Sequence, residues 1–420
     1  MAERALLVTV DLDAKSGWTA EERSAELREL ASSAGARIVR EEIVRRHDPS
    51  PASFVGKGKV KELADICADE RINVAIFNND LTGTQQKNLE EVMNVKTVDR
   101  TQLILDIFAR RAHSNEGKLQ VELAQLSYML PRLTGKGVTM SRQGGGIGTS
   151  GPGEQKLEVD RRRIRSRIAH LKDKLDDMGR RRSMMRASRG RFSAMTVAIV
   201  GYTNVGKSTL MNALTDSSVI VRDKLFATLD PTVRKFTMPN KQKVLFVDTV
   251  GFITDLPHHL VEAFKATLEE VVEADLLLHL VDGSHNKALE QAGAVRDVLA
   301  QIGAAGKPTI VVINKIDKTG MGGTIESLKI RFPQSIAISA LKRHGFEKLI
   351  ARVQEHMNSL TDVIGIDLPA SDARTLSLIY ENGVVLSQDY SGDTVRIEAE
   401  VPIRLKEYLE KVAKQPFPPE

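Results

Sequence analysis

The sequence predicts an α/β protein in which two parallel-sheet domains are separated by a long helical hairpin and followed by a small α+β domain. Apolar runs of strand length alternate with helical patterns over the first 110 residues, and again beyond residue 194. Between them, leucine and isoleucine recur at spacings of three and four. We expect domains at residues 1–113, 114–192, 193–362 and 371–415. A typical large domain has ~100–200 residues, so a chain of 420 residues is long enough for several domains.

The first domain has the order strand, helix, strand. Ala5–Val10 and Arg37–Val44 are strand-like, and Ala20–Ala34 between them has helical spacing. Further helix and strand patterns continue to Ala112, which favours a small parallel sheet covered by helices. The stretch from Phe54 to Lys59 contains two Gly-Lys pairs but lacks a full phosphate-binding motif, so a flexible basic turn is the favoured interpretation.

Two apolar seams predict an antiparallel helical hairpin in residues 114–192. The first seam holds Leu119, Leu123, Leu126, Leu130 and Leu133, and the second holds Leu157, Ile164, Ile168, Leu171, Leu175 and Met178. The connection from Gly135 to Gly153 contains eight glycines together with Lys136 and Arg142. A thin, basic tip fits either a disordered linker or a probe that enters a narrow RNA-lined space, and we favour the probe.

Positive charge is concentrated in this hairpin. Residues 161–191 hold thirteen Arg or Lys against three Asp, a net charge of +10 in a chain whose total is only +5. Such a local stripe is typical of a surface that binds phosphates. Because aromatic residues make up only 4% of the chain, backbone and shape recognition of folded RNA is favoured over base stacking.

A phosphate-binding loop follows the apolar strand Val197–Val200. The pattern G-x-x-x-x-G-K-[ST] is met, and a helical pattern comes next, so the motif has the strand–loop–helix context that a chance glycine turn lacks. Backbone N–H groups of such a loop surround a phosphate, the lysine reaches the β- and γ-phosphates, and the serine hydroxyl binds Mg²⁺. The nine loop residues are Gly201, Tyr202, Thr203, Asn204, Val205, Gly206, Lys207, Ser208 and Thr209.

Three later motifs, each after an apolar strand, indicate that the nucleotide is GTP or GDP. The carboxylate of Asp317 can accept two hydrogen bonds from a guanine edge, which adenine cannot offer. Ligands of open parallel sheets bind at the edge where these motifs lie. The motifs are Asp248, Thr249, Val250 and Gly251; Asn314, Lys315, Ile316 and Asp317; and Ser339, Ala340 and Leu341. In them, Asp248 approaches Mg²⁺ through water, Asn314 ties its loop to the phosphate loop, and the pair Ser339-Ala340 offers a backbone N–H to the guanine oxygen.

A further Mg²⁺ ligand is expected from the stretch Phe226, Ala227, Thr228, Leu229 and Asp230, which precedes Pro231-Thr232. From the residues alone, Thr228 and Thr232 are both candidates. Phe252 occupies the position after D-x-x-G where Ras-like GTPases place the glutamine that orients the attacking water. A benzyl group makes no hydrogen bond to water, so we expect slow intrinsic hydrolysis that an activator accelerates.

Taken together, these motifs resemble translation-factor-type P-loop GTPases of the TrmE–Era–Obg group. The long N-terminal part and the glycine-rich stretch Gly144–Arg163 narrow the resemblance to the HflX family of ribosome-associated GTPases, over nearly the whole chain. The resemblance implies Thr228 as the second protein ligand of Mg²⁺ beside Ser208, and Lys207, Thr228 and Gly251 as the catalytic set. It implies the large ribosomal subunit and its rRNA as partner and activator, with the hairpin tip directed to the peptidyl-transferase region.

Three functions fit this resemblance. GTP binding splits or rescues ribosomes and hydrolysis allows release, or the chain is a large-subunit maturation GTPase, or it is a signalling switch whose partner is not RNA. The charge stripe favours the first two. An adenine-nucleotide or RNA role for the N-terminal domain stays open. Asn204 stands where potassium-dependent relatives carry it, and a bound K⁺ and a loop-bracing role are equal alternatives.

Three features of the sequence predict the cellular compartment of the protein. No apolar run approaches the ~20 residues of a membrane span, which leaves at most a peripheral membrane association. The start lacks the basic and apolar regions of a signal peptide. Cys67 is the single cysteine, which excludes an internal disulfide and fits a reducing compartment. We therefore expect a cytoplasmic protein, and a monomer.

The last predicted domain follows a proline-containing linker at 364–371. We expect a strand at Leu376–Tyr380, a turn at Glu381–Gly383, two further strands and a closing helix at Ile403–Val412. No motif assigns this domain a function.

Overall fold

The computed structural model describes residues 3–12, 17–133, 152–188, 195–215, 225–226, 228–254, 257, 260, 264–318 and 322–413. Its packing divides the chain into two compact units. The first unit is Met1–Asp177 with Arg222–Asp230 and Ile253–Thr267, and the second is Met178–Val221, Pro231–Phe252 and Leu268–Glu420. Two short stretches of the later chain therefore pack with the N-terminal part.

A four-stranded parallel sheet forms the centre of the first unit, in the order β2-β1-β3-β4. The strands are β1 (Arg4–Leu12), β2 (Arg37–Arg46), β3 (Val74–Phe77) and β4 (Lys96–Val98). Successive side chains of β1 point to opposite faces of the sheet. Leu6, Val8 and Val10 therefore lie on one face, where they join a core cluster with Leu63 and Leu89. Leu7 points to the other face and is also fully buried.

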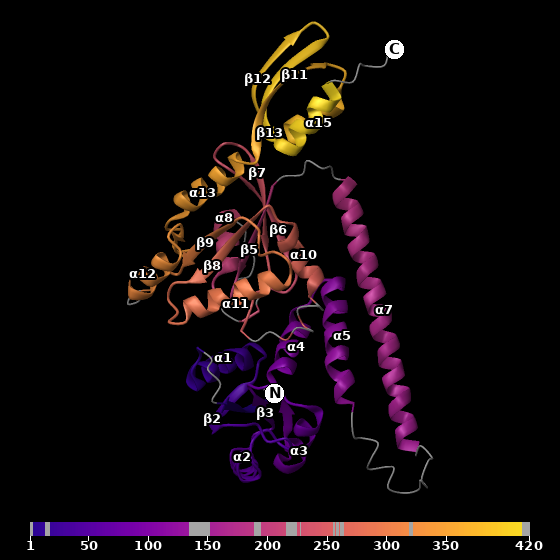
Figure 1. Ribbon diagram of the computed structural model, residues 1–420, viewed down its shortest axis with the longest axis vertical. Helices are drawn as coiled ribbons and strands as arrows, with labels where there is room; N and C mark the ends of the chain where they lie inside the picture. Colours follow the sequence, from indigo (N-terminus) through magenta and orange to yellow (C-terminus); the bar gives the residue numbers. More distant parts are fainter. Residues whose placement is uncertain are drawn as a thin grey trace. The chain divides into compact units, whose positions relative to one another are not determined.

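Helices cover both faces of this sheet, as Figure 1 shows. They are α1 (Ala20–Ser33), α2 (Lys57–Asp69), α3 (Gly83–Met93) and α4 (Arg100–Arg111). Three of the four begin at side-chain caps. Thr19 and Thr82 form capping boxes with the Glu22 and Gln85 that lie three residues on, and Asp99 accepts from the backbone N–H of Gln102 at 2.8 Å. These caps fix where the helices start.

The predicted helical hairpin is formed by α5 (Asn115–Met129), the 3₁₀ turn η1 (Leu130–Arg132) and α7 (Pro152–Ser188). Ser114 caps α5 by accepting from the backbone N–H of Gly117 at 2.9 Å. Arg167 of α7 makes a two-fold ion pair with Glu122 of α5, at 2.7 and 3.0 Å. Leu171, on the predicted seam, is fully buried. The predicted glycine-rich tip at residues 135–153 lies almost wholly outside the described residues.

The second unit contains a six-stranded sheet in the order β10-β9-β8-β5-β7-β6. All neighbours are parallel except β6 and β7. The strands are β5 (Met195–Gly201), β6 (Thr232–Thr237), β7 (Lys243–Asp248), β8 (Leu276–Asp282), β9 (Thr309–Asn314) and β10 (Ile336–Ala337). Every residue of β8 is buried, as expected for a central strand covered on both faces.

The helices of this sheet are α8 (Lys207–Thr215), α10 (Lys265–Glu273), α11 (Ala288–Gln301), α12 (Gly322–Arg331) and α13 (Phe346–Asn358). α8 follows β5 directly, which is the strand–loop–helix arrangement that the sequence predicts. The predicted α/β fold class, with a mostly parallel sheet around the motifs, is confirmed.

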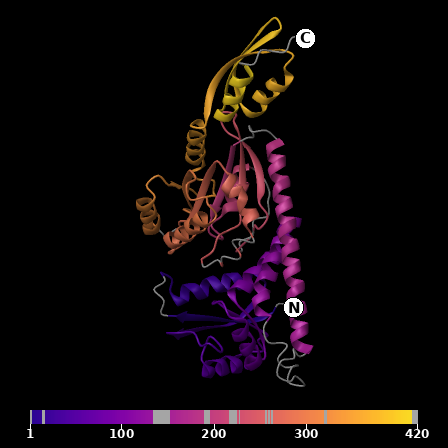
Figure 2. The same cartoon turned by 45° about the vertical axis from the view of Figure 1, so that its right-hand side comes forward.

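The chain ends in a three-stranded antiparallel sheet in the order β11-β13-β12, with both helices on one face in Figure 2. Its elements are β11 (Thr361–Pro369), α14 (Ala373–Asn382), β12 (Val384–Ser391), β13 (Thr394–Pro402) and α15 (Ile403–Ala413). Ile379, Leu405 and Leu409 are fully buried against alternate residues of β11 and β13.

Two sequence expectations are wrong here. The predicted linker at 364–371 is mostly strand β11, and the predicted strand Leu376–Tyr380 lies within helix α14. The Leu-Ser-Leu alternation suggested a strand, but the cap at Asp372, which accepts from the backbone N–H of Thr375 at 3.1 Å, starts a helix whose buried residues Thr375 and Ile379 are four apart. Among the residues that the structure describes, no helix is long and apolar enough to cross a membrane.

Candidate active site

The phosphate loop runs from the end of β5 to the start of α8, and glycine is required at both of its ends. A Cβ on Gly201 would lie 2.6 Å from the carbonyl oxygen of Leu280, and one on Gly206 would lie 2.6 Å from the amide nitrogen of Asn314. Gly206 and Asn204 also have left-handed backbones, with φ of 95° and 62°. The loop therefore follows a path that few other sequences could take.

Lys207 turns back over this loop. Its Nζ donates to the carbonyl oxygens of Gly201 at 3.1 Å and Tyr202 at 2.8 Å. The pKa of this amine is lowered to about 8, chiefly by burial and to a smaller extent by Lys315, while the carboxylate of Asp248 acts in the opposite direction. A phosphate in the loop would offer the anionic partner that this buried ammonium group otherwise obtains from Asp248.

Ser208 and Asp248 form a pair of hard oxygen ligands. The Ser208 hydroxyl donates to Oδ2 of Asp248 at 2.6 Å, and Asp248 is 2% exposed at the end of β7. A hydroxyl and a carboxylate beside a phosphate loop are the donors that Mg²⁺ prefers, since it binds few protein oxygens and several waters. These residues therefore fit Mg²⁺.

The D-x-x-G stretch after β7 lies directly on the phosphate loop. The Phe252 N–H donates to the Gly201 carbonyl at 3.1 Å, and the Thr203 N–H donates to the Phe252 carbonyl at 2.7 Å. A Cβ on Gly251 would lie 3.0 Å from Nζ of Lys207. The Phe252 side chain is 2% exposed, so its ring is a core group and offers no hydrogen bond to a water.

Asn314 joins three loops at the end of β9. Its Nδ2 donates to the carbonyl of Val205 at 2.8 Å in the phosphate loop, and its Oδ1 accepts from the N–H of Ala340 at 2.9 Å. The side chain is 2% exposed, so both bonds lie away from water. Of the pair Ser339-Ala340, expected to offer an N–H to a guanine oxygen, Ala340 donates its N–H to Asn314 in this structure.

Lys315 is held by a residue that the sequence analysis missed. Its Nζ donates to the carbonyl of Asn204 at 2.7 Å and to Oδ2 of Asp282 at 2.6 Å. Asp282 is the last residue of β8, and its other oxygen accepts from the N–H and hydroxyl of Ser284 at 2.9 and 2.6 Å. The signal in the sequence was an aspartate at the carboxyl end of a strand that is apolar except for His279.

Asp317 and Ser339 approach each other in the remaining part of the site. The Ser339 hydroxyl donates to Oδ1 of Asp317 at 2.6 Å and accepts from the N–H of Lys342 at 3.1 Å. The bond from Ser339 lowers the pKa of Asp317 despite slight opposition from burial, so the carboxylate stays ionised as a hydrogen-bond acceptor. Leu341 beside them is 75% exposed.

The other predicted stretch belongs to the first unit by its packing. Phe226 and Leu229 are 2% and 1% exposed there, Thr228 is half-buried, and the carboxylate of Asp230 accepts from the N–H groups of His113 and Ser114. Ala227 lies outside the described residues. Asp230 was predicted as a nucleotide contact, whereas the contacts that the structure gives it are to the start of α5.

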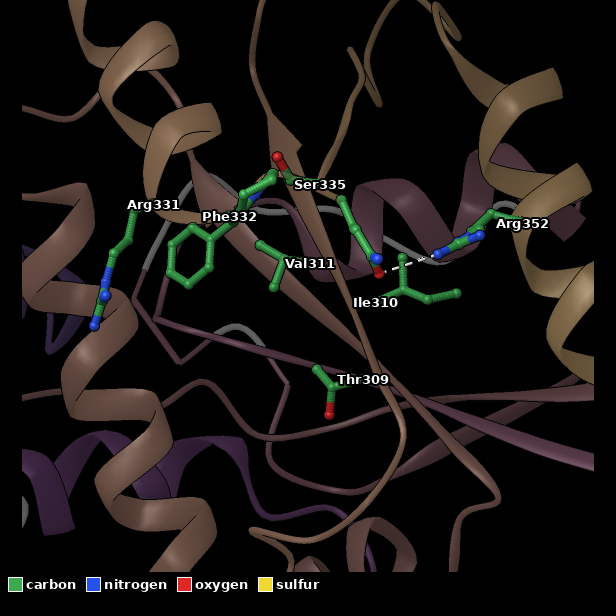
Figure 3. Close-up of a pocket in the computed structure, with 9 residues that line it drawn as sticks. Thr309, Ile310, Val311, Arg331, Phe332, Ser335 and Arg352 are labelled. Atoms are coloured by element: carbon green, nitrogen blue, oxygen red, sulfur yellow. Dashed lines mark hydrogen bonds between the residues drawn. The ribbon is translucent and has the colours of Figure 1, made fainter.

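A surface pocket of about 300 Å³ lies at the opposite end of β9, as Figure 3 shows. Thr309 and Ile310 line it at the start of the strand, together with Phe332 and Arg352. The guanidinium of Arg352 donates to the side chain of Gln334 at 3.2 Å. Asn314 ends the same six-residue strand, so roughly 16 Å separates this pocket from the nucleotide loops at ~3.3 Å per residue. It is not the candidate active site.

Three family models match successive parts of the chain. Residues 21–109 match the GTP-binding GTPase N-terminal region, and residues 111–189 match the GTP-binding GTPase middle region. Residues 196–315, which carry the phosphate loop and Asn314, match the family described as 50S ribosome-binding GTPase.

Relatives that match nearly the whole chain are GTPases of one family. The chain is 46% identical over 407 residues to GTPase HflX of Caldanaerobacter subterraneus subsp. tengcongensis, covering 97% of this chain and 93% of that protein. It is 42% identical over 407 residues to GTPase HflX of Lacrimispora saccharolytica, with 96% and 94% covered. For GTPase HflX of Escherichia coli K12 the values are 40% over 380 residues, with 90% and 89% covered. The similarity includes both the nucleotide loops and the N-terminal part.

Proposed function

The chain belongs to the HflX family of GTPases, and we propose that in the cytoplasm it binds the large ribosomal subunit and uses GTP binding to split or rescue ribosomes, with hydrolysis allowing release. The observation that carries the nucleotide half of this proposal is the bond from Asn314 to the phosphate loop at Val205. It joins the residues that would select guanine to the residues that would hold phosphate.

The ribosomal half has two supports. Residues 196–315 match a family described as 50S ribosome-binding GTPase. Independently, α7 and the residues just after it hold the +10 stripe, and exposed members include Arg162, Arg163, Lys172 and Arg181. A stripe of exposed guanidinium and ammonium groups binds an RNA backbone by neutralising phosphates, which needs no base recognition.

At the nucleotide, each residue has a separate task. Lys207 and the N–H groups of the loop hold the β- and γ-phosphates, Asp317 selects the base, and Asn314 ties the base-binding loop to the phosphate loop. Ser208 and Thr228 would hold Mg²⁺ with Asp248 behind it, and the ion when bound neutralises phosphate charge as the terminal bond breaks. Gly251 brings its N–H to the γ-phosphate, where a side chain would meet Lys207.

The expected slowness of hydrolysis follows from Phe252. Its buried ring has no group that could hydrogen-bond to the attacking water, and its backbone is bound to the phosphate loop on both sides. In GTPases a missing water-orienting group is supplied by an activator, and the corresponding rate gain can reach ~10³–10⁵-fold. We assign that role to the large ribosomal subunit.

The direct test is whether purified large subunits raise the rate of GTP turnover. The full chain is mixed with GTP and with large subunits, small subunits or neither, and phosphate release is measured under multiple turnover. We expect stimulation by large subunits only. Equal rates in all three mixtures contradict the proposed partner, and stimulation by immature large subunits alone would favour a maturation role instead.

A further inference from the structure

Two stretches, one before and one after the D-x-x-G motif in the sequence, pack with the N-terminal part of the chain. The first of them is bound at the start of a helix. Oδ2 of Asp230 accepts from the backbone N–H groups of His113 at 2.9 Å and Ser114 at 2.8 Å. Oδ1 accepts from the hydroxyl of Ser114 at 2.5 Å. Three donors on one carboxylate form a specific clasp at the N-terminus of α5, where a helix favours negative charge.

Gly117 makes room for this clasp. A Cβ on Gly117 would approach Oδ1 of Asp230 more closely than real Cβ atoms come to any atom, and it would lie 3.1 Å from the hydroxyl of Ser114. Gly117 is in the first turn of α5, where glycine weakens a helix relative to alanine. Its presence at this position is explained by the close approach of the Asp230 carboxylate.

The residues before Asp230 are held as well. The N–H of Leu225 donates to the Ser33 hydroxyl at 3.0 Å, and the ring of Phe226 meets that of Phe108 edge-on at 4.7 Å. Phe226 has a left-handed backbone, with φ of 53°. Such a conformation costs a residue with a side chain ~1–3 kcal/mol and persists where the surroundings enforce it. Leu225 and Phe226 are therefore held by contacts with the N-terminal part.

The second stretch is held by the same part of the chain. Arg100, 6% exposed, donates to the carboxylate of Glu26 at 2.6 Å and to the carbonyl of Thr254 at 3.1 Å. Phe264 packs on Phe108 with ring centroids 4.6 Å apart, so Phe108 contacts both stretches. Thr254 comes three residues after Gly251, as Asp230 comes two residues after Thr228.

We propose that the start of α5, through Ser114 and Gly117, positions the Thr228 segment for GTP hydrolysis by holding the carboxylate of Asp230. This inference rests on the proposed role of Thr228 at the nucleotide. Ser114 is a positioning residue: it contacts Asp230, and it does not contact the reacting atoms. Fixing the backbone of one residue costs ~1–2 kcal/mol of conformational entropy. If the segment is already held by the N-terminal part, GTP binding does not have to supply this free energy.

The proposal gives the N-terminal part a role in the chemistry as well as in binding a partner. Ser114 also caps α5, the first helix of the basic hairpin. A single hydroxyl thus links the Thr228 segment to the helix that leads toward the RNA-facing surface. A movement of Asp230 away from α5 would remove the acceptor of the Ser114 hydroxyl, the same group that caps the helix.

The test compares Gly117→Ala with Gly58→Ala in the full-length chain without ribosomes. Both glycines lie in the first turn of an N-terminal helix, but a Cβ on Gly58 meets nothing within 4 Å. Ser114→Ala removes the hydroxyl, and Ser114→Thr restores one. We measure kcat for GTP hydrolysis, GDP affinity, and hydrogen exchange of the His113 and Ser114 amides without nucleotide.

We expect Gly117→Ala and Ser114→Ala to lower kcat about tenfold, which is the rate equivalent of ordering one residue. GDP affinity stays at the wild-type value, and the two amides exchange faster. Gly58→Ala and Ser114→Thr behave like the wild type in all three measurements.

Wild-type or higher kcat in both Gly117→Ala and Ser114→Ala overturns the proposal. Unchanged exchange of the two amides in these variants also overturns it, because the clasp would then not exist in solution. Thr228→Ala is included as a reference. If it hydrolyses GTP normally, the proposed role of Thr228 fails and the positioning proposal fails with it, whereas a slow Thr228→Ala beside a normal Gly117→Ala removes only the positioning proposal.

Discussion

At the scale of single residues, the candidate site depends on side chains that each make two hydrogen bonds to different loops. The amide of Asn314 donates to Val205 and accepts from Ala340, and Lys315 donates to both Asn204 and Asp282. An N-K-x-D motif predicted that these residues gather at one sheet edge. The pairing of Lys315 with Asp282 and of Asn314 with the Ala340 N–H was not predicted, because both pairings depend on how separate loops fold.

Asp317→Asn is expected to change which base is bound. The substitution replaces a carboxylate that accepts two hydrogen bonds by an amide that accepts and donates, which leaves the guanine edge mismatched and suits xanthine. We expect GTP affinity to fall by at least about 100-fold while xanthosine triphosphate affinity rises. Titration with fluorescent nucleotides measures both, and Asp367→Asn, on an exposed strand position, is the control. Equal GTP affinity in Asp317→Asn and wild type rules out the assignment of Asp317 to the base.

His279 is expected to make the second unit sensitive to acid. It is 2% exposed in the central strand β8, and its Nε2 has no hydrogen-bond partner within the described part of the chain. Burial, with Arg296 and Lys207 as further causes, lowers its pKa from 6.5 to about 4. Between these values the unfolded chain binds a proton that the folded chain does not, so the free energy of unfolding falls as pH falls, by about 1.4 kcal/mol per pH unit.

Urea unfolding between pH 7 and pH 4 checks this dependence. His279→Gln keeps a polar side chain of similar length but does not titrate. From pH 7 to pH 4, the unfolding free energy of the wild type should therefore fall by up to about 3 kcal/mol relative to that of the variant. Parallel pH curves for the two proteins would show that His279 is not a buried neutral side chain.

At the scale of elements, apolar periodicity predicted most helices and strands of the two large sheets, and capping residues such as Thr19 and Asp99 account for several helix starts. It failed at α14, where a strand-like alternation lies inside a helix. Packing decides such short segments: Thr375 and Ile379 are the buried residues of the helix, and Ile379 joins the apolar cluster with residues of β11 and β13. The attachment of the Thr228 stretch to α5 could not be foreseen either, because Ser114 and Asp230 lie 116 residues apart.

The basic face of α7 is expected to bind RNA by neutralising its phosphates. Arg162→Glu with Arg163→Glu should lower the affinity for large subunits and reduce the slope of log affinity against log salt by about 2, because each phosphate that is no longer neutralised lowers that slope by about 1. Arg404→Glu with Lys411→Glu makes the same change in net charge on the exposed face of α15. Sedimentation at several salt concentrations measures both pairs. If the two pairs weaken binding equally, the effect is one of total charge and α7 has no special part in it.

At the scale of the whole molecule, the sequence predicted the family and the order of its segments because each motif carries its own chemistry. A phosphate loop needs glycines and a lysine, a guanine site needs a carboxylate, and an RNA-binding surface needs concentrated positive charge. What the sequence did not reveal is how these parts act on one another. The contacts of Asp230 with Ser114 and of Thr254 with Arg100 join residues that are more than 100 positions apart in the chain, and no motif predicts them.

The central claim is that GTP binding by this chain drives a change in the ribosome. Light scattering of purified intact ribosomes, mixed with the full-length chain and either GTP or a non-hydrolysable analogue, tests it most directly. We expect scattering to fall with both nucleotides, because separation of the subunits needs GTP binding and not its hydrolysis, and to stay constant with GDP. Constant scattering with GTP and with the analogue would contradict the account.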